Sequence, residues 1–294
     1  MGSFPIDGLL PELCSRLQGS GILIVQAPPG AGKTSRVPLA LMGELVDGVR
    51  PEGRILLIEP RRLAAKAAAT RLAQSIGEPV GKRIGYSVRN EQKRSEATIV
   101  EAITDGLFLR RLQSQPDLPG VGTVIFDEFH ERRRDSDVAL ALLREARRLL
   151  RPELKLLLMS ATLQLESLAA QFEGAETLTS HGRAFPVETH HCPPRDQERI
   201  ETHVLRALEE ELTQIECNRR IGENPPGILV FLPGVGEIER CRQKLISVQR
   251  LQNWQVLTLH GQLSLKLQSE SLKPCEASWD GRIVLATSIA ESSL

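Results

Sequence analysis

The loop at residues 27–34 carries the residue types that bind phosphate groups. Two glycines, Gly30 and Gly32, allow successive backbone N–H groups to turn toward an anion, and the following helix adds the positive end of its dipole. Lys33 can then reach the outer phosphates and the Thr34 hydroxyl can ligate Mg²⁺. A glycine-rich turn without a ligand is the alternative. An apolar run before the loop and its Gly-Lys-Thr ending favour phosphate binding by Ala27, Pro28, Pro29, Gly30, Ala31, Gly32, Lys33 and Thr34.

Two carboxylates, Asp127 and Glu128, directly follow a second apolar run at Val124–Phe126. Acids in this position lie at the carboxyl edge of an open α/β sheet, where ligands bind. We expect Asp127 to hold Mg²⁺ and Glu128 to polarise an attacking water. A solvated pair of acids at a strand end is the alternative explanation.

A third segment, Ser160-Ala161-Thr162, also comes directly after an apolar run. Alone it is equally explained by Thr162 capping a helix. Its order after the other two segments indicates that it belongs to the same site.

Strands that end at one sheet edge, each followed by a helix, must position these segments. Runs rich in Ile, Val and Leu alternate with amphipathic stretches, which predicts doubly wound α/β layers. The nearly continuous apolar character of the runs indicates parallel strands covered on both faces. The predicted strands are Gly21–Gln26, Arg54–Ile58, Thr98–Ile103, Gly122–Phe126, Lys155–Met159, Gly227–Leu232, Val256–Leu259 and Arg282–Ala286. The predicted helices are Arg61–Ile76, Ser136–Leu150, Ile200–Cys217 and Glu237–Val248.

A polar segment at residues 180–186 interrupts this alternation and predicts a linker. A length of 294 residues also favours two domains. We therefore expect domains at residues 1–180 and 187–294, with the linker at 181–186. The second domain is short and ends just after a strand, so we expect it to be incomplete.

The composition restricts how the chain can bind its partners. Lys+Arg and Asp+Glu both number 37, so any contact with nucleic acid must come from local features. The five scattered cysteines predict reduced thiols without a metal site. No apolar run approaches the roughly 20 residues that span a membrane, and no signal peptide is evident. We expect a soluble cytoplasmic protein.

Several motifs together resemble those of a known family. In chain order they are APPGAGKT, EPRRLAA, TDGLFLR, DEFHER, SAT and ATSIAESSL. They resemble the motifs of DEAH-type helicases of superfamily two, and the GRAFPVE segment adds a similarity to the bacterial HrpB-type members. The resemblance covers essentially the whole chain. It implies α/β architecture with two RecA-like P-loop domains built on parallel sheets, the second incomplete.

The resemblance also implies an ATP-dependent helicase that uses ATP and Mg²⁺ and moves on single-stranded nucleic acid, with RNA favoured. Thr34 and Asp127 would hold the metal, while Lys33, Glu128 and His130 would serve catalysis. Arg71 would join the loop in binding ATP by stacking on adenine, although an exposed helical arginine is the alternative. Ser160 and Thr162 would couple hydrolysis to movement. The expected nucleic-acid contacts are Arg61, Arg62, Thr104, Asp105, Gly106, Gly234 and Thr287.

Three departures or ambiguities accompany the resemblance. Phe129 stands where the family's name motif has alanine and must pack locally. The run Arg132-Arg133-Arg134 fits a nucleic-acid patch, a solvated helix start or a domain interface. No segment matches the family's arginine-finger motif, and such fingers contribute on the order of 10³–10⁵ in rate. If Leu294 is the true end, we expect ATP binding to survive and hydrolysis and unwinding to be weak.

Two other functions compete with a helicase. A non-catalytic remnant could bind nucleotide or nucleic acid without turnover. A P-loop enzyme unrelated to nucleic acid is the second alternative. The EPRRLAA and TDG segments argue against that enzyme, because phosphate chemistry alone does not require them.

Overall fold

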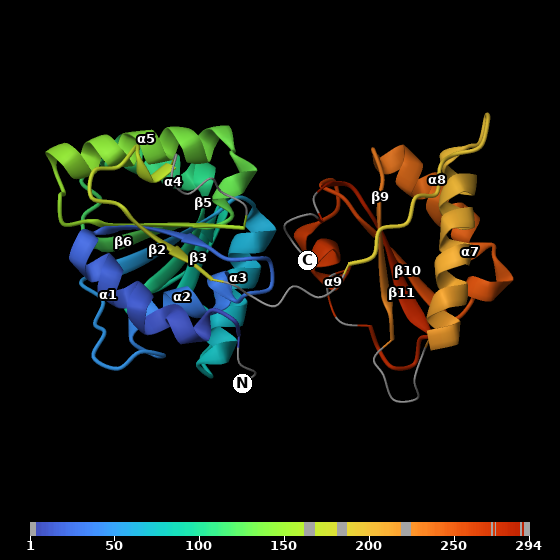
Figure 1. The fold of residues 1–294 in the computed structure, drawn as a ribbon, viewed down its shortest axis with the longest axis horizontal. Coiled ribbons are helices and arrows are strands. Elements are labelled where there is room, and N and C mark those ends of the chain that lie inside the picture. The colour runs from blue at the N-terminus through green and yellow to red at the C-terminus, as the bar shows by residue number, and fades with distance from the viewer. Residues whose placement is uncertain are drawn as a thin grey trace. The chain divides into compact units, whose positions relative to one another are not determined.

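The computed structural model describes residues 4–161, 168–180, 187–218, 225–271, 273, 275–288 and 290, and only the backbone of residues 216, 218, 265 and 269. The chain forms two compact units, Met1–Pro186 and Val187–Leu294. Each is described separately (Figure 1). Thr162 and all of the predicted linker, residues 181–186, lie outside the described residues.

Unit 1 is built around a sheet whose strand order is β4-β3-β5-β2-β6-β7-β1-β8 in the described part of the chain. All neighbouring strands pair in parallel except β3 and β4, which are antiparallel. The strands are β1 (Ile22–Gln26), β2 (Arg54–Glu59), β3 (Ile84–Val88), β4 (Glu91–Lys93), β5 (Val100–Thr104), β6 (Val121–Phe126), β7 (Lys155–Ser160) and β8 (Glu176–Thr179).

Helices cover both faces of this sheet and give three layers (Figure 1). Buried residues of α1, α2 and α3 form the core on one face, and those of α4 and α5 form the core on the other. In the second core the Phe108 and Phe126 rings meet edge to face at 5.8 Å. The helical segments are η1 (Asp7–Leu9), α1 (Leu10–Ser20), α2 (Lys33–Met42), α3 (Arg62–Ser75), α4 (Asp105–Ser114), η2 (Phe129–Glu131) and α5 (Arg134–Leu149).

The parallel arrangement brings the motif segments to one edge of the sheet. Strands β5, β2, β6, β7 and β1 are consecutive neighbours, so their carboxyl ends line up in that order. The residues at or directly after those ends are Thr104, Glu59, Asp127, Ser160 and Ala27. The segments predicted to bind ATP and Mg²⁺ and those predicted to bind nucleic acid in unit 1 therefore lie at the same sheet edge.

Unit 2 contains a parallel three-stranded sheet in the order β10-β11-β9 within its described residues. Helices α7 and α8 pack on one face, as Figure 1 shows, and form a core with buried residues such as Cys241, Ile283 and Leu285. The elements are α7 (Ile200–Asn218), β9 (Gly227–Phe231), α8 (Val235–Ile246), η3 (Gln249–Leu251), β10 (Trp254–Leu259), α9 (Leu265–Ser271) and β11 (Gly281–Ala286).

The structure corrects two expectations about the strands. Not every parallel strand is covered on both faces, because β9 pairs on one side only within the described residues and its Leu229 and Phe231 are exposed at 36% and 53%. The sequence pattern also missed β3, β4 and β8. Strand β3 contains Gly85, where an added Cβ would lie 2.5 Å from the Lys93 carbonyl oxygen of β4. Because β4 leaves no room for a side chain at this position, the residue is glycine, and it interrupts the apolar run.

No helix in the described part of the chain is long and apolar enough to cross a membrane.

The packing of Gly281 against Trp254 yields a stability prediction. An added Cβ at Gly281 would overlap the Trp254 ring, whereas one at Gly227 would meet nothing within 4 Å. We expect Gly281→Ala to destabilise unit 2 by about 1–3 kcal/mol, the usual cost of overpacking a core. Urea denaturation followed by Trp fluorescence measures the change. Gly227→Ala is the matched control and should be neutral, and equal stability of the two variants would contradict the packing.

Candidate functional site

The loop between β1 and α2 has the backbone conformation of a phosphate cradle. Gly30 and Gly32 have φ of 75° and 94°, in the left-handed region that favours glycine. At Gly32 an added Cβ would also lie 2.8 Å from the Phe4 side chain. Lys33 is only 5% exposed, and its ammonium donates to the carbonyl oxygens of Ala27 at 2.6 Å and Pro28 at 3.3 Å. The carbonyl oxygens of the loop therefore hold the Lys33 ammonium within the loop.

The N-terminal segment braces this loop, a feature that the sequence pattern did not predict. The Ile6 amide donates to the Ala31 carbonyl at 3.2 Å. The Arg36 guanidinium lies 5.5 Å from the Phe4 ring centroid and pairs with Asp7 at 2.7 Å. The only sequence signal for this contact is an apolar-acidic stretch before the first helix, and such stretches are common.

Asp127 lies beside the loop because β6 ends near β1 at the same sheet edge. Its amide donates to the Ile58 carbonyl at 3.0 Å, and its carboxylate accepts a short hydrogen bond from the Thr34 hydroxyl. The side chain is 5% exposed. The two predicted metal ligands, Thr34 and Asp127, are therefore brought together.

Glu128 and His130 adjoin Asp127 in a tight turn. Glu128 has φ of 48°, so the chain bends sharply after β6. The His130 Nδ1 atom lies 3.3 Å from the Glu128 Oε2 atom and 3.4 Å from the Ala161 amide nitrogen. Between them Phe129 is buried, with its ring edge to face at 5.9 Å from Phe126, as its local packing requires.

Two buried acids, Glu59 and Asp127, lie close to the partly exposed Glu128. Burial and the neighbouring Glu128 charge raise the pKa of Asp127 to about 6, although the Thr34 hydrogen bond opposes this. Partial burial also raises the pKa of Glu128. Burial and the charge of Asp127 raise the pKa of Glu59 well above its usual range, and its Oε1 atom has no hydrogen-bond partner among the described residues. Excess negative charge is thus concentrated beside the phosphate loop.

This arrangement fits a magnesium–nucleotide complex. Two oxygen donors, from Thr34 and Asp127, face the loop, and a cation there would offset the repulsion among the acids. The described residues include no group of three or more His, Cys, Asp or Glu that could hold a metal. Protein sites usually bind Mg²⁺ through one or two side chains together with phosphates and water.

A groove of about 860 Å³ lies at the same sheet edge, beyond β2. Five arginines contribute to its walls, namely Arg61, Arg62, Arg89, Arg110 and Arg133. Thr104, Asp105 and Gly106 also line it, so the nucleic-acid residues predicted in unit 1 come together. The sequence pattern missed Arg89, Arg110 and Gln113. Arg89 is found at the two-residue turn of the β3–β4 hairpin, whose pairing no local motif indicates.

Two of the lining residues, Asp105 and Arg133, pair with each other. Asp105 is 5% exposed and accepts hydrogen bonds from Arg133 at 2.7 Å and the Gly106 amide at 2.7 Å. It therefore holds Arg133, the member of the 132–134 run that lines the groove. Arg132 instead pairs with Asp137 and lies over Phe129, while Arg134 is 90% exposed.

Arg61 connects the groove with the acid-containing turn. Its guanidinium pairs with Glu131 at 3.7 Å, directly after the segment that carries Asp127, Glu128 and His130. The two halves of the edge are thus joined by an ion pair.

Of the remaining predicted residues, Arg71 and Ser160 adjoin the acids and the loop, and Gly234 and Thr287 belong to unit 2. Arg71 is exposed on α3, near enough to Glu59 to lower its pKa by charge. Ser160 is fully buried, and its carbonyl accepts from the Ala27 amide at 3.0 Å. In unit 2, Gly234 and Thr287 follow the parallel neighbours β9 and β11, so they share one sheet edge.

Comparisons with known proteins identify the family of this chain. A family model described as DEAD/DEAH box helicase matches residues 12–170, more than half of the chain. The chain belongs to the DEAD/DEAH box helicase family. The "ATP-dependent RNA helicase HrpB" of Escherichia coli (strain K12) is 40% identical over 295 residues, which cover 100% of this chain and 34% of that protein.

Solved structures confirm the predicted resemblance and the RecA-like α/β fold class. A crystal structure of the Escherichia coli DEAH/RHA helicase HrpB has a TM-score of 0.85 and 40% identity, covering 99% of this chain and 35% of that one. A crystal structure of the E. coli DExH-box NTPase HrpB has a TM-score of 0.77 and 40% identity, with coverages of 100% and 34%. This helicase chain spans about a third of the length of these relatives.

The acid cluster predicts how the stability of the nucleotide-free chain depends on pH. Because the folded pKa of Asp127 is about 6 against an ordinary 3.8, the folded state holds its proton more tightly than the unfolded chain does. The free energy of unfolding should therefore fall as the pH rises through this window. Glu59→Gln removes one acid and should raise the melting temperature at pH 7 by roughly 2–4 °C, the effect of about 1 kcal/mol in such a domain.

Thermal melts at pH 5 and pH 7 test this prediction. The gain from Glu59→Gln should shrink at pH 5, where the parent's acids are protonated. Glu96→Gln, at an exposed position, is the control and should not change the melting temperature. A Glu59→Gln variant less stable than the parent at pH 7 would contradict the repulsion.

Proposed function

We propose that the chain is the nucleotide-binding part of an ATP-dependent helicase that moves on single-stranded RNA. The observation that carries this proposal is the shared sheet edge, where the phosphate loop and the arginine-lined groove are joined through β2 and β6. RNA is favoured because the similar Escherichia coli protein is named an RNA helicase.

The loop and the acids would divide the work of hydrolysis. Loop amides and Lys33 would hold the phosphates, and Thr34 and Asp127 would hold Mg²⁺, which neutralises phosphate charge when bound. Glu128 would orient a water molecule and accept its proton. Its raised pKa supports this role, because a base works best when its pKa approaches the working pH.

His130 would connect the hydrolytic acid to the segment after β7. A single ring nitrogen, Nδ1, faces both the Glu128 carboxylate and the Ala161 amide. It can accept a hydrogen bond from Ala161 or donate one to Glu128, but it cannot do both. Which of these two hydrogen bonds forms would link the Glu128 carboxylate to the backbone beside Ser160, a residue predicted to couple hydrolysis to movement.

The groove would hold the sugar–phosphate backbone. Arginines and the backbone near Gly106 can bind phosphates without reading bases, which suits movement along any sequence. The described lining residues include no aromatic side chain on which bases could stack. Gly234 and Thr287 would add contacts from unit 2, and Arg71 would stack on the adenine.

A binding module without turnover is the second candidate. Nucleotide and RNA binding without hydrolysis would favour it.

Two substitutions in the ATP site should separate binding from hydrolysis. Lys33→Ala removes the buried ammonium and should weaken binding of a fluorescent ATP analogue at least tenfold. Glu128→Gln should keep that binding and lower RNA-stimulated turnover by about 10²–10⁴, the usual contribution of a general base. Nucleotide binding by fluorescence and phosphate release measure the two effects. Unchanged binding and turnover in both variants would contradict the site assignment.

Substitutions in the groove should weaken RNA binding without affecting nucleotide binding. Arg62→Ala and Arg110→Ala each remove one expected phosphate contact. Each should therefore weaken RNA binding and reduce the slope of log affinity against log salt by about the amount that one phosphate contact contributes. Fluorescence anisotropy with a labelled oligouridine at several salt concentrations measures both quantities. Arg148→Ala, on the exposed surface of α5, is the matched control. If it weakens binding as much as the groove variants do, the groove is not the site.

A further inference from the structure

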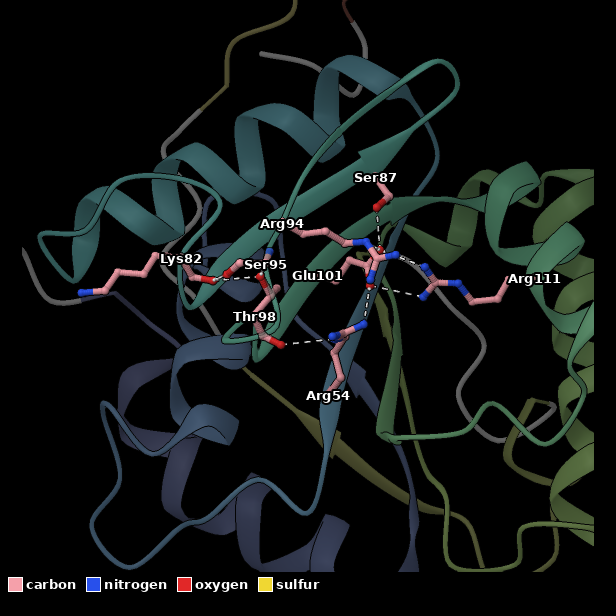
Figure 2. A network of polar contacts seen from close by, with 8 residues as sticks. All are labelled: Arg54, Lys82, Ser87, Arg94, Ser95, Thr98, Glu101 and Arg111. Carbon is pink, nitrogen blue, oxygen red and sulfur yellow. Dashed lines mark hydrogen bonds and ion pairs between the residues drawn. The ribbon is translucent and has the colours of Figure 1, made fainter.

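One buried carboxylate, Glu101 of β5, is surrounded by three arginines (Figure 2). Its side chain is completely buried. Arg111 of α4 donates hydrogen bonds to both carboxylate oxygens, at 3.0 and 3.2 Å. The guanidinium nitrogens of Arg54 in β2 and of Arg94 lie 3.4 and 3.6 Å from the carboxylate oxygens. The Ser87 hydroxyl of β3 donates to the same carboxylate at 2.6 Å. We call these five residues the Glu101 network.

The Glu101 network joins the elements that carry the walls of the groove. Ser87 precedes Arg89 by two residues on the β3–β4 hairpin, and Arg111 adjoins Arg110 on α4. Glu101 itself is three residues before Thr104, which places it about 10 Å from the groove along the strand. Strand β2, which begins at Arg54, leads directly to Arg61 and Arg62. Four elements, namely β2, the β3–β4 hairpin, β5 and α4, therefore meet at one carboxylate.

Directional contacts add to the packing that holds α4 against the strands. Phe108 and Leu112 bury its apolar face, and the hydrophobic contribution of that burial is itself non-directional. The two-pronged contact of Arg111 with Glu101 sets the position of the helix as well as attracting it. Although burial opposes ionisation, hydrogen bonds from Arg111 and Ser87 hold the pKa of Glu101 below its usual value, so the carboxylate stays charged at neutral pH.

We propose that Glu101 is a positioning residue for the RNA groove, holding the β3–β4 hairpin, β5 and α4 at the separation that lets their arginines and amides contact one backbone. The inference rests on the proposed function, because it requires the groove to bind RNA. Without the carboxylate, three neighbouring cations would repel one another and spread these elements apart.

The opposite role makes the opposite prediction. If the three arginines simply attract RNA, or bind a phosphate themselves, Glu101 weakens that attraction. Removing its charge would then tighten RNA binding, because the chain would gain a net positive charge. Positioning predicts weaker binding from the same substitution, so the sign of the change decides between the two.

The test compares Glu101→Gln and Arg111→Lys with the parent 294-residue chain. Glu101→Gln keeps the side-chain shape, and Arg111→Lys keeps the charge but loses the two-pronged contact. Labelled oligouridine binding is measured by anisotropy across salt concentrations, and binding of a fluorescent ATP analogue is measured alongside. Leu17→Ala, a core substitution in α1 on the opposite face of the sheet, controls for loss of stability.

The proposal expects both network variants to bind RNA about 5–10-fold more weakly, with a salt slope lower by about one to two contacts. Their nucleotide affinity should match the parent's, and Leu17→Ala should bind RNA like the parent despite a lower melting temperature. Unchanged or tighter RNA binding by Glu101→Gln would overturn the proposal, as would parent-like binding by Arg111→Lys if Glu101→Gln fails to fold. If the parent does not bind RNA, or Arg62→Ala binds as well as the parent, the proposed function fails instead.

Discussion

Parallel pairing of β5, β2, β6, β7 and β1 is the constraint on which the rest of unit 1 depends. In a parallel sheet each crossover carries the chain back to the amino edge, so every strand ends at the same carboxyl edge. Segments as far apart in sequence as Ala27 and Ser160 therefore meet without any specific attraction among them. The phosphate loop, the acid-containing turn and the arginine-lined groove are positioned by topology first and by polar contacts second.

The polar contacts divide this edge into two regions of opposite charge. Glu59, Asp127 and Glu128 concentrate negative charge where a cation would bind, and this costs stability in the nucleotide-free protein. Arginines of the groove lie on the other side of β2, and the Arg61–Glu131 pair links the two regions. A chain with a net charge of zero can thus present a strongly basic groove, because the charges are separated locally rather than balanced residue by residue.

The parts of this site that could be predicted from sequence are those encoded by local spacing. Gly30, Gly32, Lys33 and Thr34 lie in one loop, and Asp127 and Glu128 directly follow an apolar run. Glu101 and Arg111 could not be predicted, because their contact depends on the packing of α4 against β5. The fold class followed from strand–helix alternation. Strand β3 was missed because Gly85 is required by a neighbouring strand, which no property of β3 itself reveals.

The phosphate loop and the groove share one sheet edge, and we expect them to act as one unit. The most direct measurement is the affinity of a fluorescent, non-hydrolysable ATP analogue with and without saturating single-stranded RNA, and the affinity for RNA with and without the analogue. Linkage requires both affinities to change by the same factor, and we expect a factor of about 5 or more. Affinities that are each unaffected by the other ligand would contradict the account.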